Sequence, residues 1–336
     1  MKKQILYLDG WRGLAIGSLL IGHFFPVPGV NMGAVGVALF FVLSGLLMAQ
    51  VLFIQKTPFA TFYKRRVSRV FPSVAVYLAL ITCIFLFAGI EVVPRELIAA
   101  GTFTNNYFVT TEWKMPFGHI WSLSVEEHSY VILSLAAWWC RAKKVEGAHT
   151  VAAVLLVIIA AIGIYSLMPG AAPSSFSLRT EVASFGIFVS AFWFLVLAGR
   201  KAFPSGRWVA PVALAIGVLC HWWSIPTGVR VIVGYGALAI SINAMPSAYG
   251  LFVRLLEMPL ILRLGRYSFS LYLWQQPYYQ LVRHFGMHPA IGLGLALLTG
   301  WVAYTLLENP ARLYLNRKWA ANPLAAPDQK PLELIK

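Results

Sequence analysis

The first apolar segment of the chain, "RGLAIGSLLIGH", contains two ionisable residues, Arg12 and His23. Arg12 and His23 are eleven positions apart. At ~100° per residue they lie on nearly the same face of a helix, and at a rise of ~1.5 Å per residue they are roughly 16 Å apart along its axis. Ionisable side chains are costly inside a bilayer and often mark a pathway. Imidazole titrates near neutral pH, so His23 is a candidate general base. The simpler alternatives are a structural histidine bonded between helices and an Arg12 that snorkels or pairs with Asp9 one turn earlier.

A cluster of basic residues in "FYKRRVSRVFP" comes just before the third apolar segment. Arg66 and Arg69 are i, i+3 neighbours and share one helical face. Control of topology and attraction to anionic lipid would explain such a cluster. The more specific interpretation is a binding site for a donor that carries phosphates, such as coenzyme A, because arginine binds phosphate in bidentate fashion.

Two adjacent carboxylates, Glu126 and Glu127, occur in "HIWSLSVEEHSY". Ser124 and Glu127 have the spacing of a capping box, which gives Glu127 a structural role and leaves Glu126 for chemistry. Ser122 is a candidate oxyanion donor, with a main-chain N–H as the alternative. The aromatic run that ends at Trp121 is typical of an interfacial belt, with a platform for sugar rings as the alternative.

Two further acidic residues have simpler explanations. Glu181 lies two positions after Arg179, which predicts a local ion pair. Glu308 precedes Pro310 and predicts the end of a helix, with Arg312 as its partner.

Composition indicates that membrane helices position these residues. Of 336 residues, 59% are hydrophobic and 12% charged, against roughly 25% charged in soluble domains. We expect an all-α polytopic membrane protein. Of the 27 Lys and Arg residues, 21 lie on one side of the predicted topology, so the positive-inside rule places both termini in the cytosol. The expected spans are about ten: 12–27, 33–54, 71–89, 120–140, 150–168, 181–198, 209–223, 229–246, 267–285 and 290–307.

Several classes of function are disfavoured. The net charge of +15 is accounted for by the cytosolic loops, so we expect no nucleic-acid partner. Three scattered cysteines and the absence of HExxH and CxxC patterns predict no metal. Asp9 and Arg12 interrupt what would otherwise be a signal peptide. We expect a membrane domain over 1–312 and a loosely ordered cytosolic tail over 313–336.

The motifs together resemble the acyltransferase-3 family of integral membrane acyltransferases. "YLDGWRGLAIGSLLIGHF" is similar to the family's first helix, with its Arg-x10-His signature at Arg12 and His23. "VGVALFFVLSGLLM", the RxxR at Arg66 and Arg69, "HIWSLSVEEHSY", "LGRYSFSLYLWQQP" and "YTLLENPAR" follow in family order. Two departures are Gln275, where many relatives have His, and His128, where Gln is frequent.

The resemblance implies an acyl-CoA donor, usually acetyl-CoA, that enters from the cytosol, and an acceptor hydroxyl on an extracytoplasmic glycan or glycolipid. It implies location in the bacterial inner membrane, His23 as the catalytic residue, and Arg66 with Arg69 on the path of the donor. Arg12 would lie where the phosphates of the donor reach. We further expect Glu126 to orient the His23 imidazole.

Two other classes of function fit the same composition. A transporter or flippase for a lipid-linked glycan would use polar groups within the membrane and outer aromatic residues. A membrane sensor or scaffold would have lost the site, with Gln275 as the only indication. The intact Arg12, His23, Arg66, Arg69 and Glu126 favour the acyltransferase.

Overall fold

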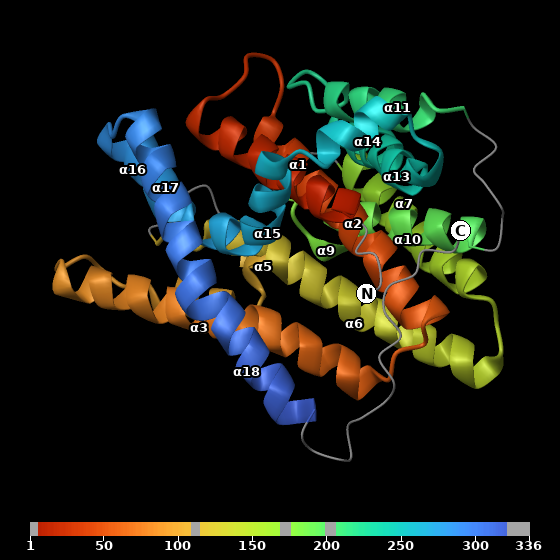
Figure 1. The fold of residues 1–336 in the computed structure, drawn as a ribbon, viewed down its shortest axis with the longest axis horizontal. Coiled ribbons are helices and arrows are strands. Elements are labelled where there is room, and N and C mark those ends of the chain that lie inside the picture. Colours follow the sequence, from red (N-terminus) through yellow and green to blue (C-terminus); the bar gives the residue numbers. More distant parts are fainter. Residues whose placement is uncertain (1–5, 109–114, 169–175, 199–205, 321–336) are drawn as a thin grey trace. The chain divides into compact units, whose positions relative to one another are not determined.

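A computed structural model describes residues 6–108, 115–168, 176–198 and 206–320 (Figure 1). Within these ranges the regular structure is helical, apart from one isolated bridge between Val30 and Trp222. The all-α prediction is confirmed. Five described helices are long and apolar enough to cross a membrane: Met32–Ile54, Phe59–Phe87, Gly147–Leu167, Thr180–Leu197 and Pro289–Ala320. The count of ten spans and the side of the termini stay predictions.

The chain divides into two compact units. The α2 unit comprises Ile5–Lys56 and Ser122–Arg266, and the α3 unit comprises Thr57–Trp121 and Tyr267–Leu334. The helices of the α2 unit are α1 (Leu6–Phe24), α2 (Met32–Ala49), η1 (Gln50–Ile54), α6 (Trp121–Lys143), α7 (Gly147–Leu167), α9 (Thr180–Ala183), α10 (Phe185–Leu197), α11 (Val209–Leu219), α12 (Thr227–Val229), η3 (Arg230–Gly234), α13 (Tyr235–Asn243), η4 (Met245–Ser247), α14 (Gly250–Leu256) and the first half of α15 (Pro259–Trp274).

The centre of the α2 unit is α2, which packs against α1, α10 and α13. Its contact with α1 depends on glycine, because a Cβ on Gly22 would lie 2.2 Å from the Gly33 nitrogen and one on Gly36 would lie 2.5 Å from the Ala15 oxygen. No side chain fits at such distances. The end of α1 therefore meets the beginning of α2, and the two helices are antiparallel.

The α3 unit contains α3 (Phe59–Phe87), α4 (Pro94–Gly101), α5 (Asn105–Phe108), η2 (Gly118–Ile120), α16 (Gln276–Phe285), α17 (Pro289–Ala303), η5 (Tyr304–Glu308) and α18 (Asn309–Ala320). Figure 1 shows α18 crossing α3, and Ser68 Oγ donates to Asn316 Oδ1 at 3.1 Å. The basic cluster was expected just before the third span. Instead α3 starts at Phe59 and continues through Pro72, so Arg66 and Arg69 are on the helix itself.

Hydrogen bonds fix the segment that leads into α6. The Tyr77 hydroxyl donates to the Pro116 carbonyl at 2.7 Å, and Asn105 Nδ2 donates to the Phe117 carbonyl at 2.8 Å. Phe117 is fully buried and Phe103 nearly so. These two rings are therefore core residues rather than members of an exposed aromatic platform. Trp113, from the same run, lies outside the described residues.

The predicted span 267–285 is interrupted in the structure. One helix, α15, ends at Trp274, and α16 begins at Gln276, with Gln275 at the break. Pro277 explains the break, because proline lacks the N–H that would continue the ladder of helical hydrogen bonds.

Candidate active site

His23 lies in the last turn of α1, where this helix meets the beginning of α2. A Cβ built on Gly33 would be 3.4 Å from both Cδ2 and Nε2 of the imidazole. The ring therefore covers the first turn of α2 at the position of Gly33, and any larger residue there would press on it.

The beginning of α2 is capped from two sides. Asn31 Oδ1 accepts a hydrogen bond from the Ala34 N–H at 3.0 Å, and the Asn31 N–H donates to the His221 carbonyl at 3.0 Å. The first N–H groups of a helix have no acceptor within the helix and carry partial positive charge. The Met32 N–H also donates, to the Val30 carbonyl at 3.0 Å, so what the start of α2 offers beside His23 is mainly the partial positive charge of the helix end.

Arg12 is one turn after Asp9, and its Nη1 lies 2.6 Å from Asp9 Oδ1. Pairing with Asp9, one of the predicted alternatives for Arg12, is confirmed. Both side chains keep about a fifth of their surface exposed. Because α1 is continuous from Leu6 to Phe24, Arg12 and His23 share one helix at the expected spacing.

Glu126 contacts α2 far from His23. Ser44 Oγ donates to Glu126 Oε1 at 2.7 Å. Ser44 is eleven residues beyond Gly33, roughly 16 Å along α2. Since α1 and α2 are antiparallel, Ser44 lies at the level of Arg12. These positions favour separate roles for Glu126 and His23 over the direct pairing expected from the sequence.

The capping-box interpretation of Ser124 and Glu127 is wrong. A 3₁₀ turn, Gly118–Ile120, leads directly into α6 at Trp121, so Ser124 is already inside the helix and cannot be its N-cap. Glu127 is half-buried in the second turn of α6. Ser122 precedes Glu126 by four residues, so the two share a face.

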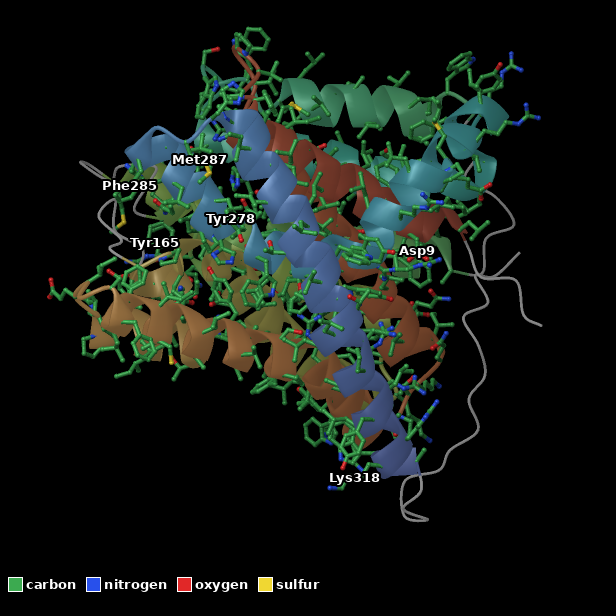
Figure 2. The ribbon with its side chains drawn as sticks, turned by 60° about the vertical axis from the view of Figure 1, so that its left-hand side comes forward. Asp9, Tyr165, Tyr278, Phe285, Met287 and Lys318 are labelled. Atoms are coloured by element: carbon green, nitrogen blue, oxygen red, sulfur yellow. The ribbon has the colours of Figure 1, made fainter. Side chains whose placement is uncertain are left out.

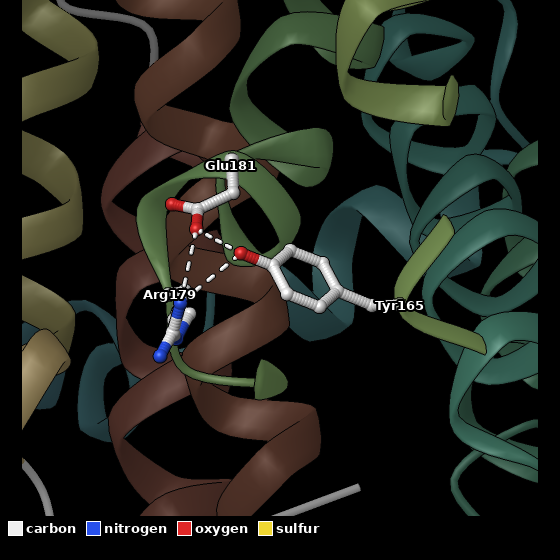
Figure 3. A network of polar contacts seen from close by, with 3 residues as sticks. All are labelled: Tyr165, Arg179 and Glu181. Carbon is white, nitrogen blue, oxygen red and sulfur yellow. Dashed lines mark hydrogen bonds and ion pairs between the residues drawn. The ribbon is translucent and has the colours of Figure 1, made fainter. Parts of the chain in front are cut away.

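His128 joins α6 to α9, because its Nδ1 lies 2.7 Å from Thr180 Oγ1. The two neighbours of Thr180 in sequence form the network of Figure 3. Tyr165 Oη donates to Glu181 Oε1 at 2.8 Å and accepts from Arg179 Nη1 at 3.1 Å, while Arg179 and Glu181 are 3.9 Å apart. The predicted ion pair is confirmed, and Tyr165 is the member that sequence reasoning missed.

The remaining predicted residues belong to the α3 unit. Arg66 and Arg69 are half-buried on α3, one turn apart, on either side of the fixed Ser68. Trp121 is the first residue of α6. Gln275 is fully buried, and its Nε2 donates to Gln276 Oε1 at 3.2 Å.

Glu308 does not end a helix, contrary to expectation. It lies in the π-helical turn η5, through which α17 continues into α18. Its buried carboxylate accepts from Ser270 Oγ at 2.6 Å, while Arg312 donates to Asn309 Oδ1 at 2.9 Å. The i, i+4 spacing suggested a partner on the same helix, whereas the actual partner is on α15.

His221 is a buried residue that the sequence did not single out. Its Nδ1 is 2.7 Å from the Gly217 oxygen, and Nε2 has no hydrogen-bond partner within the described ranges. Because its carbonyl accepts from Asn31, His221 supports the α2 cap beside His23.

Within the described residues, no three or more His, Cys, Asp or Glu side chains are placed together to hold a metal ion.

Comparison with known proteins gives consistent matches. An acyltransferase-domain family model covers residues 5–307. The chain is 26% identical to O-acetyltransferase OatA of Staphylococcus aureus, covering 91% of this chain and 57% of that protein. It is 23% identical to peptidoglycan O-acetyltransferase OatA of Listeria monocytogenes (82% and 49%) and 24% identical to putative peptidoglycan O-acetyltransferase YrhL of Bacillus subtilis (91% and 54%).

The chain thus spans about half the length of these curated relatives. No solved structure matches it significantly. The family model, however, extends over nearly the whole described chain, from the start of α1 into η5, and includes every residue of the candidate site. The chain therefore belongs to the acyltransferase-3 family.

Proposed function

We propose that the protein is a membrane O-acyltransferase that moves an acyl group, acetyl in the first instance, from acyl-CoA to a hydroxyl of an extracytoplasmic glycan or glycolipid. The observation that carries the proposal is the placement of the His23 ring against the Gly33 turn of α2. A general base next to the positively polarised start of a helix suits acyl transfer to a hydroxyl, in which an oxyanion develops. Family membership and the peptidoglycan O-acetyltransferase names of the relatives support it.

In the proposed reaction, an imidazole nitrogen of His23 removes the proton of the acceptor hydroxyl as its oxygen attacks the thioester carbonyl. The carbonyl oxygen becomes an oxyanion, which the partial positive charge at the start of α2 would stabilise. The C–S bond then breaks, the ester forms, and the coenzyme A thiolate takes the proton from the imidazolium. No metal takes part.

The donor would extend from the level of Arg12 to that of His23. The separation of roughly 16 Å between these levels suits a donor whose thioester lies at the end of a flexible arm. Arg12 would meet its charged groups, with Arg66 and Arg69 on the entry path. Glu126, which is bonded to Ser44, would position the part of the donor that lies at the level of Arg12. Glu127 and Ser122 would lie on the neighbouring surface of α6. Trp121 would contact the acceptor.

The proposed setting is the bacterial inner membrane, with ten spans and both termini in the cytosol. The membrane domain would be 1–312, followed by a cytosolic tail, 313–336. Residues 321–336 of this tail lie outside the described part of the chain.

The test reconstitutes purified protein in liposomes with labelled acetyl-CoA and a membrane-glycan extract. We expect label on glycan with the wild type and a loss of at least ~100-fold in His23→Ala, because general base catalysis contributes that much. Acetyl-CoA binding, measured separately, should persist in His23→Ala. It should weaken in Arg66→Gln and Arg69→Gln but not in Arg65→Gln, the exposed residue next to Arg66.

Two outcomes would contradict the proposal. Full transfer by His23→Ala at equal expression would remove His23 from the chemistry. Movement of a lipid-linked glycan across the bilayer without acyl-CoA, and without label transfer by the wild type, would instead favour the transporter.

A further inference from the structure

The α3 unit encloses a cavity of about 1070 Å³ that the proposed reaction does not use. It lies between α3, α16 and the continuous helix of α17 and η5, and its wall is mostly apolar. Figure 2 shows α3 and the α17–α18 helix crossing and then diverging, with the labelled Tyr278 and Phe285 of α16 at the wide end. The volume is at the upper end of the range for small-molecule sites.

The three helices each contribute a regular stripe to this wall. On α3 the stripe includes Leu80 and Ile84, and on α17 and η5 it includes Leu298, Val302 and Leu306. The last stripe continues to Leu307, nine residues from Leu298, so the cavity extends for roughly 13 Å along that helix. A space of this length lined with aliphatic side chains fits a hydrocarbon chain.

The cavity changes character along its length. Gln280 and His284 line it on the last two turns of α16, which is the end near the turn to α17. At the opposite end the wall consists of the rings of Trp274, Pro277 and Tyr278 and of aliphatic residues of α17 and η5. Thr299 does not alter this contrast, because its hydroxyl donates to the Leu295 carbonyl of its own helix at 2.8 Å. The occupant should therefore have one polar end.

One positively charged residue, Arg283, lies at the polar end, beside the lining residue His284. Arg283 is exposed next to His284, with Nη1 2.7 Å from the Tyr279 hydroxyl. Basic groups at the mouth of a pocket between membrane helices attract acidic lipid headgroups. Both walls, α3 and α17, belong to helices long and apolar enough to cross a membrane, so hydrocarbon has direct access to the space between them.

We propose that this cavity binds a membrane lipid with an anionic headgroup, its chain between α3 and α17 and its headgroup beside Arg283 and His284. Two sources share this chemistry: an acidic phospholipid, and a polyprenyl-phosphate carrier that brings a glycan to the enzyme. Binding is independent of whether acyl transfer occurs, so the test needs no turnover.

The test places the full-length protein in nanodiscs that contain phosphatidylglycerol with a photoreactive group on its acyl chain, and maps the labelled peptides by mass spectrometry. Phosphatidylcholine with the same chain is the headgroup control. Ala303→Phe fills the wall of the cavity, and Leu297→Phe, on an exposed face of the same helix, is its matched control. His284→Gln with Arg283→Gln removes positive charge at an exposed site without touching the core.

We expect label on the α3 and α17 stripes, with a roughly fivefold preference for phosphatidylglycerol that the Arg283 and His284 substitutions remove. Ala303→Phe should reduce this labelling and Leu297→Phe should not. If unlabelled polyprenyl phosphate displaces the photoreactive lipid and excess phosphatidylglycerol does not, the occupant is the carrier. If phosphatidylglycerol displaces it and polyprenyl phosphate does not, the occupant is the phospholipid. The proposal would be overturned if the cavity stripes are labelled no more than Leu156 and Val157, which are exposed residues of α7, and show no headgroup preference.

Discussion

Ser44 on α2 donates a 2.7 Å hydrogen bond to the Glu126 carboxylate on α6, at the level of α2 that faces Arg12 rather than His23. A carboxyl group between apolar helices needs hydrogen-bond partners, because an unsatisfied polar group there is costly. The Ser44 bond therefore ties α2 to α6 at this level.

The Ser44→Ala variant should lose stability, because it removes this donor to Glu126. We expect a cost of about 1 to 3 kcal/mol, read from thermal unfolding in detergent. Ser129→Ala is the matched control, since its buried hydroxyl donates to the Val125 carbonyl of its own helix, and it should cost less than about 1 kcal/mol. Equal losses of stability in the two variants would mean that the Ser44 bond contributes no more than a hydrogen bond within one helix.

A methyl group at Gly33 should impair the reaction more than the fold. The Gly33→Ala Cβ would stand 3.4 Å from the His23 ring, so the imidazole must shift by a few tenths of an ångström. Because misplacement by 1 Å can cost about 100-fold, we expect kcat to fall on the order of tenfold. Gly163→Ala, on a helix with open space around the new methyl group, should keep full activity. Unchanged kcat in Gly33→Ala would remove the contact from the mechanism.

The sequence predicted the type of fold and the ranges of most helices, because apolar stretches and turn residues act locally. It did not predict where α3 begins, since the apolar residues define a span from residue 71 while the helix extends back through the basic cluster to Phe59. It also missed the start of α6, where the 3₁₀ turn before Trp121 moves Ser124 into the helix interior. Both errors arise where tertiary packing outweighs a local signal.

For the site, spacing within one helix was informative and contacts between helices were not. The Arg12–Asp9 pair follows from i, i+3 spacing. By contrast, the Ser44–Glu126 and Ser270–Glu308 bonds join residues 82 and 38 positions apart, and nothing local in the sequence selects them.

Tyr165 should contribute more to stability than the ion pair that it bridges. The side chains of Arg179 and Glu181 keep 40% and 33% of their surface exposed and are 3.9 Å apart, so their direct attraction is worth less than about 1 kcal/mol and is screened by salt. The Tyr165 hydroxyl makes shorter contacts to both and connects α7 to the start of α9. We expect Tyr165→Phe to cost about 1 kcal/mol at both low and high salt, and Tyr314→Phe, on an exposed ring of α18, to cost nothing measurable. If the cost of Tyr165→Phe disappears at high salt, the network is held by charge, and the hydroxyl only reports on the ion pair.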